Sequence, residues 1–280
     1  MVSGSNGHRI RKPAVAGTFY PDNAGVLKEQ IDFFLENLEE QEIKGEIYGL
    51  ISPHAGYMYS GQVAAAGYKQ LLGRDYDVVL VISPSHREYF KGVSAFCGEG
   101  YETPLGIVPV AEELCRRLTE QSDLIFDSWT GHQEEHALEV QLPFLQRVLG
   151  EFRLIPLVMG DQNYDDAIEI GEAIARILRH EKALVVASSD LSHYYPAEVA
   201  EKMDNRVIRQ VNNYNYEELW NDIEMKHSEA CGAGPIVAAM IATRKMNANK
   251  SEVLLYRHSG HVTGDNTAVV GYLSAVMYRV

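Results

Sequence analysis

Nearly continuous apolar runs alternate with amphipathic stretches along this chain. Four short runs rich in Val, Ile and Leu read as strands buried on both faces: IYGLIS (47–52), DVVLVIS (77–83), FRLIPLVM (152–159) and ALVVASS (183–189). The stretches around them predict helices over residues 60–72, 111–121, 136–150, 164–180 and 229–246. This alternation is typical of an α/β protein with a mostly parallel central sheet flanked by helices.

The stretch 164–180 shows the helical pattern clearly, because isoleucines recur near the 3.6-residue period and aspartates stand at its start. Towards the C-terminus, EVLLYRHSG (252–260) and TAVVGYLSAVMY (267–278) predict two strands that pair in antiparallel fashion. No Pro/Gly/Ser-rich linker, repeat or low-complexity segment divides the chain. We therefore predict a single domain over residues 1–280.

The chain is strongly acidic, with a formal net charge of −14. Nucleic acids and anionic membranes are bound through basic faces, so the charge argues against either as the main partner. No apolar segment reaches the about 18 residues of a membrane span. The start, MVSGSNGHRIRKPAVAG, also lacks the long apolar region of a secretory signal. These features predict a cytoplasmic protein.

The three cysteines, Cys97, Cys115 and Cys231, show neither a paired framework nor a C-x-x-C spacing. This favours a reducing compartment in which each cysteine is a free thiol or a metal ligand. Cys97 lies in a strand-like run and Cys115 in an amphipathic helix, so both read as buried thiols.

Three histidines follow predicted buried strands: His54 in LISPH, His86 in LVISPSH and His193 in LVVASSDLSH. In open α/β sheets, ligands bind beyond the carboxyl ends of the strands. A single histidine after a strand is usually an ordinary loop residue. Three of them indicate one shared site, provided that the strands are neighbours.

Imidazole is the commonest metal ligand in proteins, so strand-end histidines predict a metal site. Cys231, in EACGAGP, is a candidate soft ligand, because small residues around it permit close approach of the backbone. The alternative for Cys231 is a small buried apolar residue. Asp190 could orient a histidine that transfers protons, namely His193, or it could cap a following helix.

The stretch GHQEEHALEVQLPFL (131–145) places His132 and His136 four residues apart. It is not the H-E-x-x-H motif of zinc proteases, because Gln133 follows His132. We read it mainly as an amphipathic helix whose polar end rims the site. Neither a phosphate-binding glycine loop nor a G-x-S-x-G motif is present, which gives little support to nucleotide binding or serine hydrolysis.

The motifs together resemble the Memo family. The matching segments are AVAGTFYPDN (14–23), SPHAGYMYSG (52–61), ISPSH (82–86), EEHALEVQLPFL (134–145), SSDLSHY (188–194) and CGAGPI (231–236). Prokaryotic members are called AmmeMemoRadiSam system protein B, and the vertebrate member is a mediator of ErbB2-driven cell motility. The family is similar in fold to class III extradiol dioxygenases, which are nonhaem iron enzymes.

The resemblance implies a metal pocket built by His54, His86 and Cys231, with Asp190 and His193 close by as catalytic residues. Extradiol dioxygenases hold iron with two histidines and a carboxylate, whereas here Cys231 stands where the carboxylate is expected. A thiolate favours iron or copper, with zinc as an alternative, and argues against ring cleavage. The implied partners are a small molecule or a peptide in the cleft, and the prokaryotic name implies a functional link to a radical SAM protein.

Three functions follow from these observations. The first is a metal-dependent oxidoreductase in which His193, oriented by Asp190, handles protons. The second is a non-catalytic module that binds a peptide or protein in the same cleft through Phe19, Tyr20, Tyr57 and Tyr59; the alternative for each of these aromatic residues is packing in the core or at the rim. The third is a zinc hydrolase.

Overall fold

The computed structural model describes residues 10–39 and 41–280. Residues 1–9, where most of the expectation about a missing secretory signal falls, lie outside this part of the chain. Among the described helices, none is both long and apolar enough to cross a membrane.

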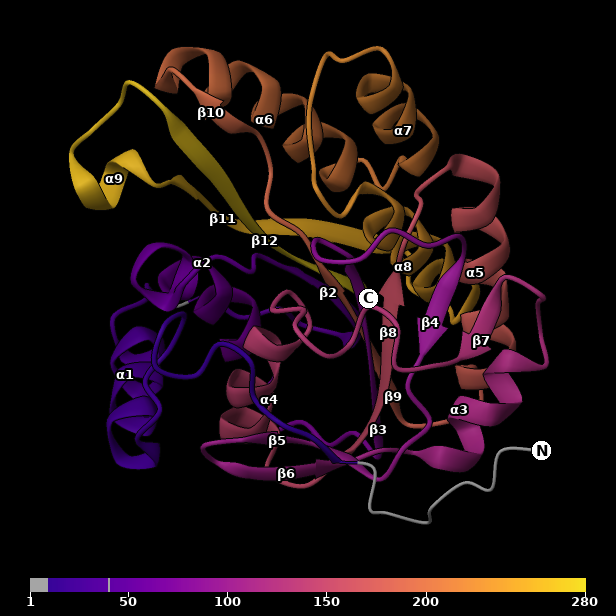
Figure 1. Ribbon diagram of the computed structural model, residues 1–280. Helices are drawn as coiled ribbons and strands as arrows, with labels where there is room; N and C mark the ends of the chain where they lie inside the picture. Colours follow the sequence, from indigo (N-terminus) through magenta and orange to yellow (C-terminus); the bar gives the residue numbers. More distant parts are fainter. Residues whose placement is uncertain (1–9, 40) are drawn as a thin grey trace.

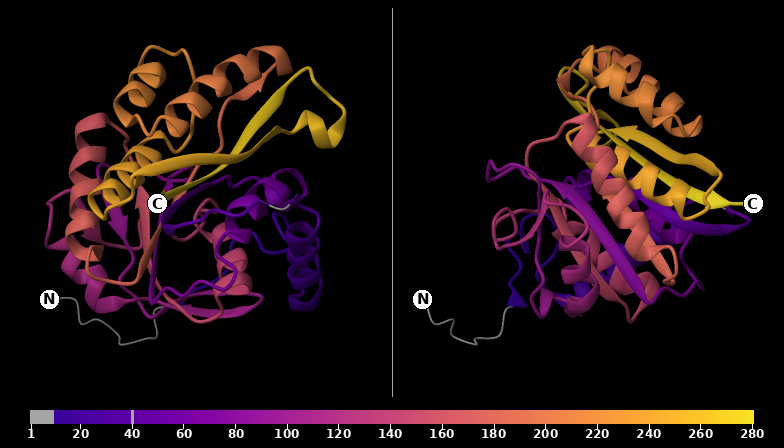
Figure 2. Two further views of the ribbon diagram at one scale, coloured as in Figure 1. Left: turned by 180° about the vertical axis from the view of Figure 1, so that it is seen from behind. Right: turned by 90° about the vertical axis from the view of Figure 1, so that its right-hand side faces the viewer.

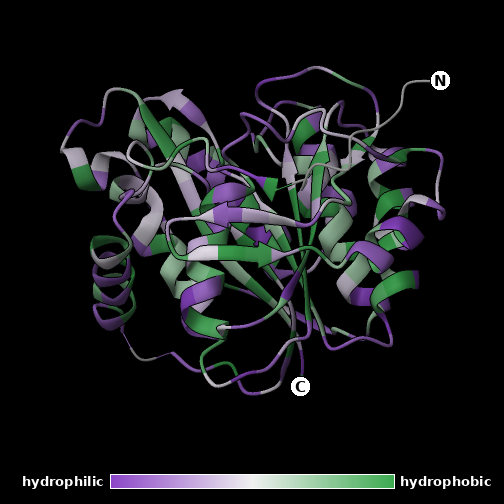
Figure 3. Cartoon of the chain, turned by 60° about the horizontal axis from the view of Figure 1, so that its bottom comes forward, coloured by the Kyte–Doolittle hydropathy of each residue, from purple (hydrophilic) through white to green (hydrophobic). Residues whose placement is uncertain are grey.

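Four parallel strands form the centre of the main sheet, in the order β2–β9–β3–β8. They are β2 (Glu46–Ser52), β3 (Val78–Pro84), β8 (Arg153–Met159) and β9 (Ala183–Ser188). Each agrees with its predicted run to within one residue. β3 and β9 are buried at every position, as their continuous apolar sequences require. Figure 3 shows these hydrophobic strands running through the middle of the molecule.

Antiparallel strands extend the sheet on both sides. β12 (Val269–Arg279) pairs with β2, with β11 (Lys250–His258) and with the short β10 (His193–Tyr195). On the other side, β4 (Val93–Ala95) runs antiparallel to β8, and β7 (Ile125–Asp127) lies parallel to β4. The predicted antiparallel pair near the C-terminus is therefore confirmed.

Helices cover both faces of the sheet (Figure 1, Figure 2). One group contains α1 (Ala24–Glu36), α2 (Tyr57–Lys69) and α4 (Leu142–Leu149), and a second group contains α5 (Tyr164–Leu178), α6 (Ala197–Asn212), α7 (Tyr216–Glu224) and α8 (Ala233–Lys245). In the first group, α2 packs against β2 and β12. In the second group, α8 packs against β9 and β3, and α6 packs over β11 and β12. The predicted α/β class with a mostly parallel centre is confirmed.

Helix α8 is apolar around most of its circumference because it lies between the sheet and α5. Gly171 of α5 allows the two helices to approach closely. A Cβ atom there would lie 2.7 Å from the carbonyl oxygen of Ala238. Gly171 thus fixes the middle of α8 against α5, and Cys231 lies just before the first turn of α8.

Smaller elements complete the described chain. A second sheet combines β1 (Ile10–Arg11), β5 (Gly100–Thr103) and β6 (Gly106–Pro109). The helix α3 (Glu112–Thr119) follows it, and the short α9 (Gly260–Thr263) lies at the tip of the β11–β12 hairpin.

The helix predicted over 136–150 begins later than expected. Residues 136–138 are not helical, a 3₁₀ turn η1 covers Glu139–Gln141, and α4 starts at Leu142. Pro143 fits only the first turn of a helix, because it lacks an amide hydrogen. Glu139, the first residue of η1, is buried and accepts hydrogen bonds from Arg11, from Tyr20 and from the amide of Ala14 (2.8 Å), all of them long-range contacts that local periodicity does not reveal.

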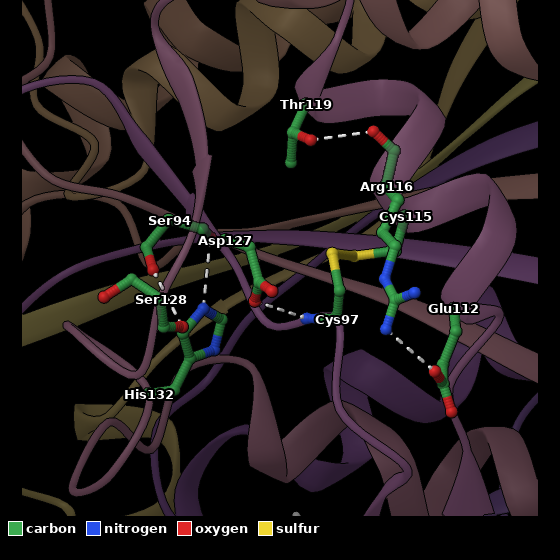
Figure 4. Close-up of a disulfide and its surroundings, with 9 residues drawn as sticks. All are labelled: Ser94, Cys97, Glu112, Cys115, Arg116, Thr119, Asp127, Ser128 and His132. Carbon is green, nitrogen blue, oxygen red and sulfur yellow. Dashed lines mark hydrogen bonds and ion pairs between the residues drawn. A yellow bond between two sulfur atoms is a disulfide. The ribbon is translucent and has the colours of Figure 1, made fainter. Parts of the chain in front are cut away.

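Cys97 and Cys115 form a disulfide, which corrects the expectation that every cysteine is unpaired. Figure 4 shows the bond joining the segment after β4 to α3. Cys97 lies just beyond β4 rather than inside a strand, and its amide donates to Asp127 Oδ1 at 3.1 Å. The sequence carried no pairing signal, since the partners are 18 residues apart and meet only through packing. The disulfide removes the argument from unpaired cysteines for a reducing compartment.

Candidate metal centre

Three adjacent strands deliver polar side chains to one edge of the sheet. Three polar residues lie two positions past the end of a strand: His54 follows β2, His86 follows β3 and Asp190 follows β9. Since β9 lies between β2 and β3, these side chains converge beyond the carboxyl ends of neighbouring strands. Cys231 reaches the same place from the loop before α8, where its amide donates to the carbonyl of Asp190 (3.2 Å).

Hydrogen bonding determines which nitrogen of His54 faces the site. Ser188 Oγ donates to the carbonyl of Ala137 (2.7 Å), so it can accept from His54 Nδ1 at 2.9 Å. Gln141 Nε2 donates to the same hydroxyl at 2.8 Å. The proton of the neutral ring therefore lies on Nδ1, and Nε2 presents a lone pair to Cys231 Sγ at 3.1 Å.

His86 is held by the buried carboxylate of Glu135. Its amide donates to Oε2 at 2.5 Å, and its ring Nδ1 lies 3.0 Å from Oε1. A carboxylate on one ring nitrogen leaves the other free to bind a metal and makes it more basic. The ring of His86 lies 5.0 Å from that of His54, measured between centroids.

His136 joins these two histidines, although the sequence indicated only a rim position for this segment. Its ring centroid lies 5.4 Å from that of His54 and 4.8 Å from that of His86. One ligand nitrogen from each of the three rings falls within 4.8 Å of the others. His136 Nδ1 is buried without a hydrogen-bond partner, although Glu135 Oε1 lies 3.2 Å away. The non-helical conformation of residues 136–138, which no local pattern predicts, places the ring here.

Small residues bring Cys231 into contact with the strand ends. A Cβ atom on Gly232 would lie 2.4 Å from the carbonyl oxygen of Ser188, and one on Gly234 would lie 2.4 Å from Met159 Sδ. The expectation that EACGAGP allows close approach of the backbone is confirmed. The sulfur also accepts a hydrogen bond from the amide of Asp190 at 3.2 Å.

Asp190 anchors the segment that carries His54 rather than a helix. Its Oδ1 accepts from the amide of His54 at 2.7 Å, and its Oδ2 lies 4.0 Å from His54 Nε2. The alternative in which Asp190 caps a helix is wrong, because β10 follows it and α6 begins only at Ala197.

His193 lies at the start of β10 on the same side of the sheet. Its Nδ1 lies 2.7 Å from the carbonyl oxygen of Leu191, so this nitrogen donates and Nε2 is free to accept. The structure differs here from the expected orientation by Asp190. The next residue, Tyr194, has φ 64°, a conformation that is rare for a bulky side chain and that often marks functional segments.

The aromatic residues expected to line a binding cleft mostly belong to the core. Tyr20 and Tyr57 are buried, and their hydroxyls donate to Glu139 and to the carbonyl of Val140 respectively. Phe19 packs against His136, with 4.7 Å between ring centroids. Tyr59 on α2 is exposed.

Burial sets the charge of the site. It lowers the pKa of His54 well below 6.5, with the charge of His86 acting in the same direction. Burial and the neighbouring His54 also lower the pKa of His136 to about 4. Burial raises the pKa of Asp190, whereas for Glu135 the hydrogen bond and charge of His86 outweigh burial and lower its pKa to about 2. His54 and His136 are thus neutral near pH 7, next to the ionised carboxylate of Glu135.

The donor set suits a metal ion. One ligand nitrogen each of His54, His86 and His136 lies within 4.8 Å of the others, and imidazole is the commonest metal ligand. Burial and the charge of Asp190 raise the pKa of the Cys231 thiol, and a bound metal reverses this by stabilising the thiolate. The unpartnered Nδ1 of His136 adds a further donor beside His54 and His86.

Comparison with known proteins shows which family this chain matches. Residues 11–276 match the family model described as Memo-like protein. A MEMO1 family protein of Nitrosopumilus maritimus is 36% identical over 269 residues, covering 94% of this chain and 98% of that protein. Relatives with the same description come from Methanocaldococcus jannaschii (37% identical, 96% and 99% covered) and Aquifex aeolicus (37% identical, 96% and 99% covered).

The fold also occurs in a protein of low sequence similarity. A crystal structure of an uncharacterized protein from Escherichia coli K12 superposes with a TM-score of 0.56 at 16% identity. The match covers 82% of this chain and 99% of that one. At this level of identity the likeness concerns the fold alone.

Proposed function

This chain belongs to the Memo family, and from that premise we propose that it is a metal-dependent oxidoreductase acting on a small molecule. In this proposal His54, His86 and Cys231 hold an iron or copper ion. The observation that carries it is the 3.1 Å approach of Cys231 Sγ to the lone pair of His54 Nε2, beside the ring of His86. A soft thiolate next to two imidazoles favours a redox-active metal.

His136 is the fourth donor of the site. One of its ring nitrogens lies within 4.8 Å of those of His54 and His86, a group that does not include Cys231. An open catalytic centre keeps positions for substrate, and closed four-ligand sites are typical of structural metals. We therefore place His136 beside the ion as a group that contacts the substrate or a bound water.

Each remaining residue has a separate task in this proposal. A bound iron or copper ion would supply electron transfer at its open positions. Glu135 fixes the orientation of His86, and Asp190 holds the main chain of His54. His193 accepts or donates a proton at Nε2, because Leu191 occupies its Nδ1.

Elemental analysis of protein purified without oxygen, together with spectroscopy of the bound metal, tests the proposal. We expect close to one equivalent of iron or copper in the wild type and its loss in His54→Ala. His227→Ala is the matched control, because His227 is an exposed histidine paired with Asp222 on another part of the surface. Equal iron and copper contents in wild type and His54→Ala would overturn the proposal.

The same experiment separates the alternatives. Zinc as the sole metal, with hydrolytic activity, would favour a metal hydrolase. A protein that binds a peptide equally well with and without metal would be a binding module. Exposed Tyr194, whose ring lies 5.7 Å from that of His193, gives this second alternative a contact residue at the site.

A functional link to a radical SAM protein and a cytoplasmic location remain part of the proposal.

A further inference from the structure

A second group of metal-ligand side chains lies where helix α6 meets the β11–β12 hairpin. Glu201 comes from α6, His258 ends β11, and His261 lies in α9 at the hairpin tip. The two elements pack together, and the amide of Ala197 also donates to the carbonyl of Asn266 at 3.0 Å. Figure 1 shows α9 in yellow at the end of the hairpin, with α6 above it.

The three side chains are already close together. His258 Nε2 lies 3.4 Å from Glu201 Oε1, and the rings of His258 and His261 are 3.8 Å apart between centroids. One ligand atom from each residue falls within 4.8 Å of the others. His258 is 3% exposed and its Nδ1 has no hydrogen-bond partner, whereas Glu201 and His261 are exposed and can be reached from solvent.

We propose that Glu201, His258 and His261 form a second divalent-cation site, which takes Zn²⁺. Two imidazoles and one carboxylate are a known ligand set for zinc. With metal–ligand bonds of about 2.0–2.2 Å, the ligand atoms of a tetrahedral site lie about 3.3–3.6 Å apart. The 3.4 Å between His258 Nε2 and Glu201 Oε1 already has this length, so binding requires little movement of the buried histidine.

His261 completes the site by a local rearrangement. Its Nδ1 accepts a hydrogen bond from the amide of His258 at 3.1 Å. Turning the exposed ring towards the ion gives up this hydrogen bond, which adds little net stability because water replaces the partner. A zinc–imidazole bond outweighs that loss. The bound ion then joins α6 to the tip of the hairpin, and β12 of that hairpin pairs with β10, which begins at His193.

The site is independent of the proposed function, because none of its ligands belongs to the His54 centre. Titration with Zn²⁺, followed by calorimetry and elemental analysis after desalting, tests it in the full chain. We expect His261→Asn and Glu201→Gln each to bind one equivalent fewer than the wild type. Both altered residues are exposed, and circular dichroism checks that the fold is kept.

Two further variants separate this site from the first. His180→Asn, which alters an exposed histidine outside either cluster, should bind as the wild type does. In a His54→Ala background, Zn²⁺ should still raise the melting temperature, and adding His261→Asn should abolish that rise. Equal zinc stoichiometry in wild type, His261→Asn and Glu201→Gln would overturn the proposal and leave a simple ion pair. If the metal centre at His54 proved absent, the proposal for the second site would still stand.

Discussion

Hydrogen bonds to one nitrogen of each ring decide which nitrogen His54, His86 and His193 present to the site. The partners are Ser188, Glu135 and the carbonyl of Leu191, and each occupies Nδ1. Every Nε2 is therefore free to bind an ion or to move a proton. Each ring is thereby held through one nitrogen and presents the other.

Replacing Cys231 by serine should affect the metal far more than the fold. A serine hydroxyl is a poor ligand at neutral pH, so we expect metal affinity to fall by more than tenfold. The amide of Asp190 loses its sulfur acceptor, which should destabilise the metal-free fold by about 1 kcal/mol. Metal content and urea unfolding measure the two effects. Unchanged metal content with a large loss of stability would make Cys231 a packing residue.

Glu135→Gln should weaken metal binding without removing a ligand. The amide keeps the shape of the side chain but loses the negative charge beside His86 Nδ1. Loss of such an outer partner typically lowers metal affinity about 10–100-fold. Glu134→Gln is the matched control, because Glu134 is the exposed neighbour. Metal titrations that show equal affinities for the two variants would contradict the role given to Glu135.

His193→Gln should keep the metal and lose proton transfer. Because His193 lies outside the proposed ligand set, we expect wild-type metal stoichiometry. Turnover should fall by about 10²–10⁴-fold, the usual contribution of a general acid or base. Metal analysis alone is decisive here, even before a substrate is known. A metal loss matching that of His54→Ala would make His193 a ligand.

At the scale of elements, the Cys97–Cys115 disulfide fastens α3 to the segment after β4. It closes a loop whose ends are 18 residues apart. Closing a loop of about 15 residues stabilises a fold by about 3 kcal/mol in the chain-entropy description. We expect reductant to lower the free energy of unfolding in urea by about this amount.

The double variant Cys97→Ala/Cys115→Ala is the control for that measurement, because reductant has no bond to break in it. Metal binding at His54 should be unchanged by reduction, since neither cysteine contributes to that site. A reductant effect of equal size in the double variant would show that the disulfide is not its source.

At the scale of the whole molecule, His132 makes stability depend on pH. Burial lowers its pKa from 6.5 to about 3. Nε2 donates to the carbonyl of Ser94 at 3.0 Å, so Nδ1 accepts from the hydroxyl of Tyr101 and the ring is neutral. Below pH 6.5 the His132 side chain of the unfolded chain binds a proton, whereas that of the folded protein stays neutral. The neutral His132 therefore contributes its full share to the free energy of unfolding above pH 6.5, and this share is lost as the pH falls towards 3.

We expect the stability advantage of wild type over His132→Gln to shrink by up to about 1.4 kcal/mol per pH unit within that window. Urea unfolding of both proteins at several pH values measures the difference, in which other titrating groups cancel. An NMR titration of the His132 ring gives an independent check. A difference that stays constant with pH would mean that His132 titrates normally.

The sequence by itself located the central strands, the C-terminal strand pair and several helices, but not α6 and α7. Continuous apolar runs located β2, β3, β8 and β9, because a strand buried on both faces needs apolar residues on both. The same runs located His54 and His86, which lie two residues past β2 and β3, whereas His193 lies five residues past β9 and begins β10. The family motifs added Cys231 to this set, and the α/β class followed from the alternation of the two patterns.

Only the tertiary structure decided which of these residues meet. His54 and Cys231 are 177 residues apart and touch because β2, β9 and α8 pack together. His136 reached the site because residues 136–138 are not helical, although the local pattern predicted a helix there. Cys97 and Cys115, and likewise Glu201 with His258 and His261, are joined by packing between separate elements. The local pattern of apolar residues indicates which face of each element is buried. Contacts between loops depend instead on the order in which the strands and helices pack together.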